Sequence, residues 1–243
     1  TTLYACLSYL NNGQRKINTI EDPIEYALVR VRQSQVNPAI DLHFAELLRG
    51  VLRQAPDVIM IGEIRDPETA ATAVRAANSG HLVLATLHAP IAAAAVQSML
   101  SFGVHPHQLA SSLLGCVAQR LVRTLDPRTR MGYDVSMVPG MFEEVKHLLS
   151  PGEGETIYGP PMDERSTTSG YTGRTGVFEV MPISLVIRGL IMQQQPTPVL
   201  RRQAIQEGLI EMRQAALLKV ARGETSIEEV FRAIPAEYLN VDA

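Results

Sequence analysis

The stretch Asp57-Val-Ile-Met-Ile-Gly-Glu63-Ile-Arg65-Asp66 decides the fold that this sequence predicts. Its apolar run has the length and composition of a strand that is buried on both faces. Such a strand is typical of a parallel sheet, but burial does not require a glutamate where the strand ends. The position of Glu63 therefore calls for a chemical explanation.

Helices and strands alternate on both sides of this stretch. Apolar periodicity, capping residues and helix breakers predict where they begin and end. The predicted helices cover residues 1–11, 43–54, 67–80, 90–103 and 106–123, and the predicted strands cover residues 17–20, 58–64 and 81–88. This order predicts an α/β fold with a parallel sheet.

The composition changes after Arg123. Residues 124–175 are rich in Pro, Gly, Asp, Arg, Ser and Thr, and they predict an irregular excursion with one helix over 142–149. A strand over 177–180 returns to the fold, and the pattern from 183 to 234 is helical. We therefore expect an α/β core over 1–123, the excursion over 124–175, and the returning strand with a helical region over 176–243.

The charge of the chain argues against nucleic acid as a partner. The formal net charge is −3, so no overall positive field draws the chain to nucleic acid or to anionic lipid. Basic stretches with base-stacking aromatic residues are missing too, which argues against a DNA-translocating motor.

Glu63 is the first candidate site residue. An acid at the end of a parallel strand, near Mg²⁺ and in line with a phosphoryl group, can align an attacking water. Asp57, Arg65 and Asp66 belong to the same Walker-B-type layout. The alternative is a strand-end acid that faces solvent. The chain contains no G-x-x-x-x-G-K-[ST] loop that would hold the phosphates.

Three further acids follow the strand over 17–20. Glu21, Asp22 and Glu25 lie within five residues around Pro23, and carboxylates crowded in this way repel one another unless a cation or solvent offsets them. Beside Glu63 they could help to hold a metal ion. An equally good interpretation is a solvated turn, since Asp-Pro is a common turn pair.

Two histidines and two arginines complete the candidate set. His81 and His88 bracket one predicted strand seven residues apart, which places them on opposite faces, so they do not form a simple metal pair. For either residue taken alone, a structural histidine is the preferred interpretation. Arg49 and Arg53 share one helix face and could stabilise phosphate charge, although on their own they are better explained by surface pairing with Glu46.

Taken together, these segments resemble the secretion or traffic ATPases of type II secretion and type IV pilus assembly. This is the GspE/PulE/PilB family, to which the retraction ATPase PilT is related. Several long motifs match in the right order, which makes the resemblance specific. The matching stretches are residues 2–5, 19–26, 48–66, 80–88, 118–123, 170–179 and 225–230.

The resemblance implies a RecA-like P-loop NTPase domain that is truncated at its N-terminal side and followed by a helical C-terminal region. It implies ATP and Mg²⁺ as cofactors. A homo-hexamer and an inner-membrane platform protein are the implied partners, with the protein in the cytoplasm and peripheral to that membrane. Thr1 and Thr2 match the end of the family's phosphate loop, so the loop's Lys and its Mg²⁺-binding hydroxyl are expected just upstream.

The resemblance also assigns the candidate residues to family motifs. Glu63 falls in Walker B, the acids around Pro23 fall in the Asp box, and the two histidines fall in the His box. The expected catalytic residues are Glu63, Glu21, Glu25, His81 and His88, and the expected nucleotide-binding residues are Asp22, Asp57, Arg49, Arg53 and Arg65.

The sequence departs from the family at a four-cysteine zinc motif. The matching positions are Asp126, Thr129, Asp163 and Ser166, so thiolate zinc binding is not expected. We therefore expect no metal site in this segment.

The expected function is an ATP-hydrolysing hexameric motor of type II secretion or type IV pilus assembly. The chain by itself, without a phosphate loop, is expected to be inactive and to bind ATP poorly. The alternative hypothesis is a non-hydrolysing structural or regulatory subunit with a RecA-like body.

Overall fold

The computed structural model describes residues 1–135, 140–161 and 170–239. The chain folds as two compact units, each built from two separate segments. The first unit contains residues 1–115 and 182–203, and the second contains residues 116–181 and 204–243. The three-part domain division expected from the sequence follows composition along the chain, and it stays a prediction.

A four-stranded parallel sheet forms the centre of the first unit. Its strand order is β2-β1-β3-β4, and each neighbouring pair is parallel. The strands are β1 (Ile17–Glu21), β2 (Val31–Gln35), β3 (Val58–Ile61) and β4 (Leu82–Ala85). The predicted α/β fold with a parallel sheet is therefore confirmed.

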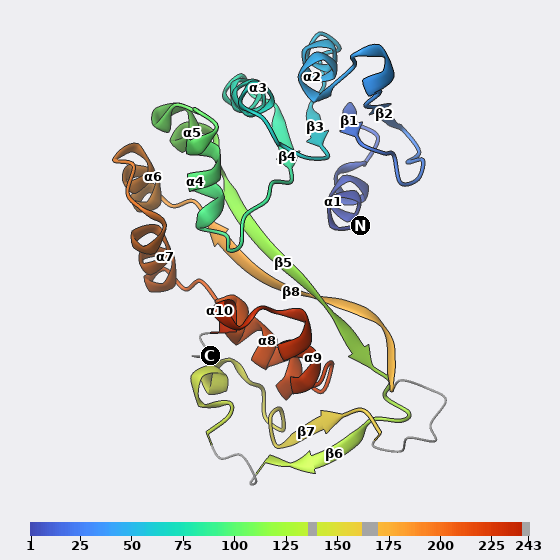
Figure 1. The fold of residues 1–243 in the computed structure, drawn as a ribbon, viewed down its shortest axis with the longest axis vertical. Coiled ribbons are helices and arrows are strands. Elements are labelled where there is room, and N and C mark those ends of the chain that lie inside the picture. The colour runs from blue at the N-terminus through green and yellow to red at the C-terminus, as the bar shows by residue number, and fades with distance from the viewer. Residues whose placement is uncertain (136–139, 162–169, 240–243) are drawn as a thin grey trace. The chain divides into compact units, whose positions relative to one another are not determined.

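Helices cover both faces of this sheet. In Figure 1, α2 and α3 lie on one side of the strands and α1 lies on the other. Tyr4 and Leu7 of α1 pack in one buried cluster with Ile17, Val58 and Met60 from the two central strands. The three helices are α1 (Thr2–Leu10), α2 (Phe44–Leu52) and α3 (Pro67–Asn78).

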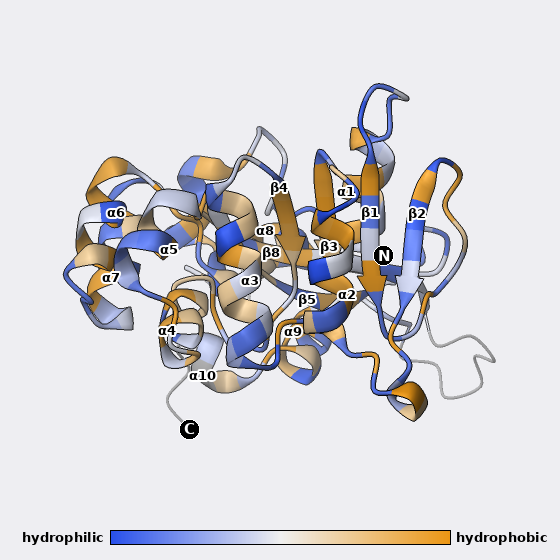
Figure 2. Ribbon diagram, turned by 90° about the horizontal axis from the view of Figure 1, so that it is seen from above, coloured by the Kyte–Doolittle hydropathy of each residue, from blue (hydrophilic) through white to orange (hydrophobic). Residues whose placement is uncertain are grey.

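Burial distinguishes the central strands from the edge strands. Every residue of β1 and β3 is buried, whereas β2 and β4 are only partly buried. Figure 2 shows that β3 is hydrophobic and β2 is largely polar, while β1 contains both hydrophobic and polar residues. The polar sequence of β2 explains why no strand was predicted there.

Three helices and a short 3-10 turn complete the described part of the first unit around this sheet. Helices α5 and α6 pack together, and the Arg188 side chain of α6 donates a hydrogen bond to the carbonyl of Ala110 in α5. These elements are η1 (Pro38–Ile40), α4 (Ala94–Ser101), α5 (Pro106–Ser112) and α6 (Leu185–Met192).

The second unit contains two strand pairs and a group of helices. The long strands β5 and β8 form one pair, and β6 and β7 form an antiparallel pair. The strands are β5 (Gly115–Leu125), β6 (Met131–Asp134), β7 (Thr156–Gly159) and β8 (Tyr171–Pro182). The helices are η3 (Glu143–Leu148), α8 (Met212–Ala221), α9 (Ile227–Ala233) and α10 (Ala236–Leu239), and α7 (Thr197–Gln206) joins the two units in sequence.

Two predictions about this region are wrong. The helix predicted over 106–123 ends at Ser112, and strand β5 begins at Gly115. The segment 124–175, predicted to be irregular apart from one helix, contains β6, β7 and the start of β8. Local propensity favoured a helix in β5 because Ala, Gln, Arg and Leu are good helix formers.

A buried glutamate ties β5 to α9. The side chain of Glu229 is fully buried and accepts hydrogen bonds from the backbone and side chain of Arg123 and from the side chain of Arg232. The guanidinium of Arg123 also lies 4.1 Å from the ring centroid of Tyr171. Both carboxylate oxygens of Glu229 are therefore saturated by partners.

None of the helices in the described ranges is long and apolar enough to cross a bilayer.

Candidate active site

Glu63 lies two residues beyond the end of β3, at the carboxyl edge of the sheet. Its side chain is 16% exposed and forms an ion pair with the guanidinium of Arg65. The Nε2 atom of His88, which follows β4, lies 2.6 Å from Oε1 of Glu63. The carboxylate of Glu63 is therefore held between the side chains of Arg65 and His88.

The electrostatics of this cluster keep Glu63 ionised. The pKa of Glu63 is lowered, first by the hydrogen bond from Arg65 and to a smaller extent by His88, and partial burial opposes both. The pKa of Arg65 is raised, mainly by Glu63, with a smaller contribution from Asp22. Asp22, Glu63, Arg65 and His88 therefore share one electrostatic environment.

Short backbone contacts fix the position of Glu63. The N–H of Gly62 donates to the carbonyl of Ile20 at 2.7 Å, and the N–H of Ile64 donates to the carbonyl of Thr86 at 2.8 Å. A Cβ at position 62 would lie 3.2 Å from the Ile20 carbonyl, so a residue with a side chain would crowd the end of β1. The segments that follow β1, β3 and β4 are thus joined around Glu63.

The acids after β1 lie in different surroundings. Glu21 is buried, and its carboxyl accepts hydrogen bonds from the side chains of Tyr4, Thr19 and Gln33. Asp22 and Glu25 are exposed. The loop after β1 therefore presents Asp22 and Glu25 to solvent, while Glu21 is occupied by protein partners.

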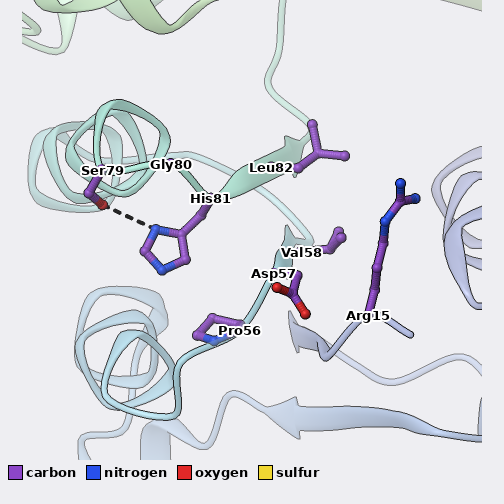
Figure 3. A pocket seen from close by; sticks show the side chains of 8 residues that line it. All are labelled: Arg15, Pro56, Asp57, Val58, Ser79, Gly80, His81 and Leu82. Carbon is purple, nitrogen blue, oxygen red and sulfur yellow. Dashed lines mark hydrogen bonds between the residues drawn. The ribbon is translucent and has the colours of Figure 1, made fainter. Parts of the chain in front are cut away.

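Asp57 and His81 lie at the opposite, amino edge of the sheet. Residues Val58 and Leu82 are paired in register, so the residues just before them start neighbouring strands. Figure 3 shows both in a pocket of about 390 Å³ that Arg15 also lines. Both residues lie at the edge opposite to Glu63, because β3 and β4 run their full length between the two edges.

The neighbours of these two residues are structural. The carboxylate of Asp57 accepts a hydrogen bond from the backbone N–H of Lys16 at 2.6 Å. The Nδ1 atom of His81 lies 3.1 Å from Oγ of Ser79 and 2.9 Å from the carbonyl of Ala76 at the end of α3. The structural alternative considered for His81 fits these contacts.

The two arginines of α2 are surface residues. Arg49 forms ion pairs with Glu46, at 2.9 Å, and with Glu68 of α3. Arg53 is exposed at the C-terminal end of α2. The surface pairing with Glu46 considered from the sequence is therefore present for Arg49.

The positions that match the family's zinc cysteines carry other interactions. Arg128 binds Asp126 through two side-chain hydrogen bonds and holds the pKa of that carboxyl at about 2. Thr129 is also described, whereas Asp163 and Ser166 lie outside the described residues. Within the described ranges, no three His, Cys, Asp or Glu side chains gather as a metal site.

No pattern in the sequence pointed to the residues that bind Glu21. Tyr4 lies on the core face of α1 with Leu7, where an aromatic residue is expected for packing alone. Gln33 lies on β2, which was not predicted. The periodicity of the sequence could not show that either side chain reaches Glu21.

The four-stranded parallel sheet with helices on both faces makes the first unit an α/β domain. The chain belongs to the family described as "Type II/IV secretion system protein", whose model matches residues 1–232.

Curated relatives agree with this family. The chain is 44% identical over 237 residues to "Type II secretion system protein E" of Dickeya dadantii, covering 98% of this chain and 46% of the relative. It is 41% identical over 238 residues to "Type IV pilus assembly ATPase TfpB" of Acinetobacter baylyi, covering 97% of this chain and 40% of the relative. The chain thus spans less than half the length of these relatives.

Solved structures agree with the fold. The crystal structure of "the Pilus Retraction Motor PilT and Bound ADP" matches with a TM-score of 0.65 and 27% identity, over 97% of this chain and 57% of that one. The ATPase DotB of Legionella pneumophila matches with a TM-score of 0.64 and 22% identity, over 94% of this chain and 54% of that one.

Proposed function

We propose that the protein containing this chain is an ATP-hydrolysing motor of type II secretion or type IV pilus assembly. The observation that carries the proposal is the ionised Glu63 at the carboxyl end of β3, within reach of His88 and Arg65. An acid in this place can orient the water that attacks the terminal phosphate. Membership of the secretion family supports the same chemistry.

Each neighbour of Glu63 has a separate role in this proposal. Glu63 in the Walker-B strand aligns the attacking water, and Arg65 holds its carboxylate in one orientation. His88, whose side chain is 91% exposed, contacts the phosphate from the His box. Glu25 and Asp22 supply the exposed carboxylates of the Asp box. Glu21, which is buried at the end of β1, positions the loop that carries them.

ATP and Mg²⁺ fit this set of residues. The exposed carboxylates of Asp22 and Glu25 are hard oxygen donors of the kind that Mg²⁺ prefers. Mg²⁺ neutralises charge that develops on the phosphate oxygens when it is bound. Asp57 and His81 are better assigned to the support of the amino edge than to the nucleotide.

The wider assignment follows the family. We propose a homo-hexamer at the cytoplasmic side of the inner membrane, where hydrolysis acts on a platform protein of the machine. Arg49 and Arg53, exposed on α2, are available to contact a neighbouring subunit, although Arg49 is already paired with Glu46 and Glu68.

Replacing Glu63 tests the proposal in the protein at its native length. Glu63→Gln keeps the shape of the side chain and removes its charge, so we expect kcat for ATP hydrolysis to fall by about 100-fold or more. Steady-state phosphate release measures the loss. Glu143→Gln is the control, since it changes a glutamate whose side chain is 67% exposed and paired with Lys146 at the surface.

The outcome separates the two hypotheses. Unimpaired turnover in Glu63→Gln would reject the role of Glu63. No turnover in the wild-type protein, with ATP binding retained, would favour the non-hydrolysing structural subunit instead.

A further inference from the structure

The hydroxyl of Tyr4 joins α1 to the acidic loop that follows β1. It donates a hydrogen bond to Oε2 of Glu21. It also accepts hydrogen bonds from the backbone N–H of Glu25, at 3.3 Å, and from Nε2 of Gln33, at 3.2 Å. One phenol oxygen therefore contacts groups from β1, β2 and the loop. Tyr4 as a whole is only 4% exposed.

The carboxyl of Glu21 depends on these donors. Glu21 is 3% exposed, and the partners that bind its two oxygens are the neutral side chains of Tyr4, Thr19 and Gln33. A buried polar group that loses a partner carries the full cost of its desolvation. Removing the Tyr4 hydroxyl would therefore release both Glu21 and the loop.

The same cluster holds the loop at a second place. The rings of Tyr4 and Tyr26 make an edge contact with centroids 4.6 Å apart. Gln33 donates to the carbonyl of Tyr26 at 3.1 Å as well as to Glu21. The loop that carries the exposed acids Asp22 and Glu25 is thus held by a cluster of contacts in which Tyr4 is central.

We propose that Tyr4 is a positioning residue for ATP hydrolysis, which fixes Glu21 and the backbone of Glu25 so that the acidic loop faces Glu63 in one geometry. The inference rests on the proposed function. A phosphoryl-transfer site supplies most of its rate through positioning, so a small displacement of a loop lowers kcat strongly. Tyr4 acts through the loop and does not itself contact the nucleotide.

Tyr4→Phe in the native-length protein is the test, because it removes one oxygen and keeps the ring. We expect kcat for ATP hydrolysis to fall by about 10-fold to 100-fold, with KM for ATP within about twofold of the wild-type value. The matched control is Tyr9→Phe on the same helix, where the ring is 88% exposed, and it should leave both constants unchanged. Melting temperatures of both variants show whether the fold is retained.

Two further variants decide the case if Tyr4→Phe folds poorly. Gln33→Met keeps the length of the side chain and removes its donors, so it should lower kcat in the same direction. The loss in Tyr4→Phe combined with Glu21→Gln should be smaller than the product of the two single losses, since the first removes and the second weakens the same hydrogen bond.

The results that would contradict the positioning role of Tyr4 differ from the result that would contradict the proposed function. An unchanged kcat in Tyr4→Phe, or losses that simply multiply in the double variant, would overturn the positioning role. The positioning role would also be overturned if the rates at low and at saturating ATP both fell in proportion to the fraction of protein that is no longer folded. If the wild-type protein itself shows no hydrolysis, the proposed function fails rather than the inference.

Discussion

Two glutamates that pair with arginines differ in their exposure, and this difference separates chemistry from stability. The side chain of Glu63 is 16% exposed, and its partners Arg65 and His88 are 62% and 91% exposed. Glu229 has a side chain with 0% exposure, and Arg123 and Arg232 occupy both of its oxygens. A saturated carboxylate cannot accept a substrate group, so we assign Glu229 to stability and Glu63 to the reaction.

The substitution Glu229→Gln should destabilise the second unit. Removing one partner of a buried ion pair leaves the arginines uncompensated, and we expect a loss of about 3 kcal/mol at pH 7. Hydrogen exchange in peptides that cover α9 measures this loss locally. Glu228→Gln, an exposed neighbour on the same helix, is the control and should change exchange little.

The effect of Glu229 should depend on pH. Its pKa is lowered from 4.5 to about 2, first by the hydrogen bond from Arg232, with Arg123 adding to this and burial opposing it. A group with a depressed pKa in the folded state stabilises the fold above its unfolded pKa. The difference between wild type and Glu229→Gln should thus be full above pH 4.5 and shrink as the pH falls toward 2. A difference that stays constant down to pH 2 would contradict the assignment.

At the scale of elements, the start of α3 holds the C-terminal end of the turn that carries Glu63. Asp66 caps α3, with Oδ1 accepting from the N–H of Thr69 at 2.7 Å and Oδ2 accepting from its hydroxyl at 2.7 Å. Pro67 occupies the first helical position, which its fixed φ suits. The sequence predicted this helix start correctly because the signal is local.

The substitution Asp66→Ala should cost about 1 kcal/mol of stability, since the first turn of α3 loses its cap. Hydrogen exchange at the N-terminal turn of α3 should rise accordingly. Asp66→Ser keeps an oxygen at the cap and should remain close to the wild type. Equal exchange in Asp66→Ala and Asp66→Ser would show that the cap contributes little.

Strand β5 shows where local signals fail. Cys116, Ala118 and Val122 are buried, while Val117 and Leu121 are exposed, which is the alternation of a strand. Pairing with β8, about fifty residues later in the chain, selects the strand over the helix that the residue types favour.

At the scale of the whole molecule, residues 1–243 lack a glycine-rich phosphate loop. Such a loop supplies the backbone N–H groups and the Lys that cradle phosphates. We therefore expect residues 1–243 alone to bind ATP no more tightly than about 1 mM, which is about −4 kcal/mol. Calorimetry on this chain, with circular dichroism to check its fold, would contradict the expectation by finding micromolar binding.

The sequence by itself determined the buried strand, the acid that follows it, the cap of α3 and the family. These features depend on residue type and short spacing, so they can be read along the chain. Only the tertiary structure decided that Asp57 and His81 lie at the far edge from Glu63, and that Tyr4 and Gln33 bind Glu21. The reason is that strand direction and register bring residues together across the sheet, and neither is written in the spacing of one strand.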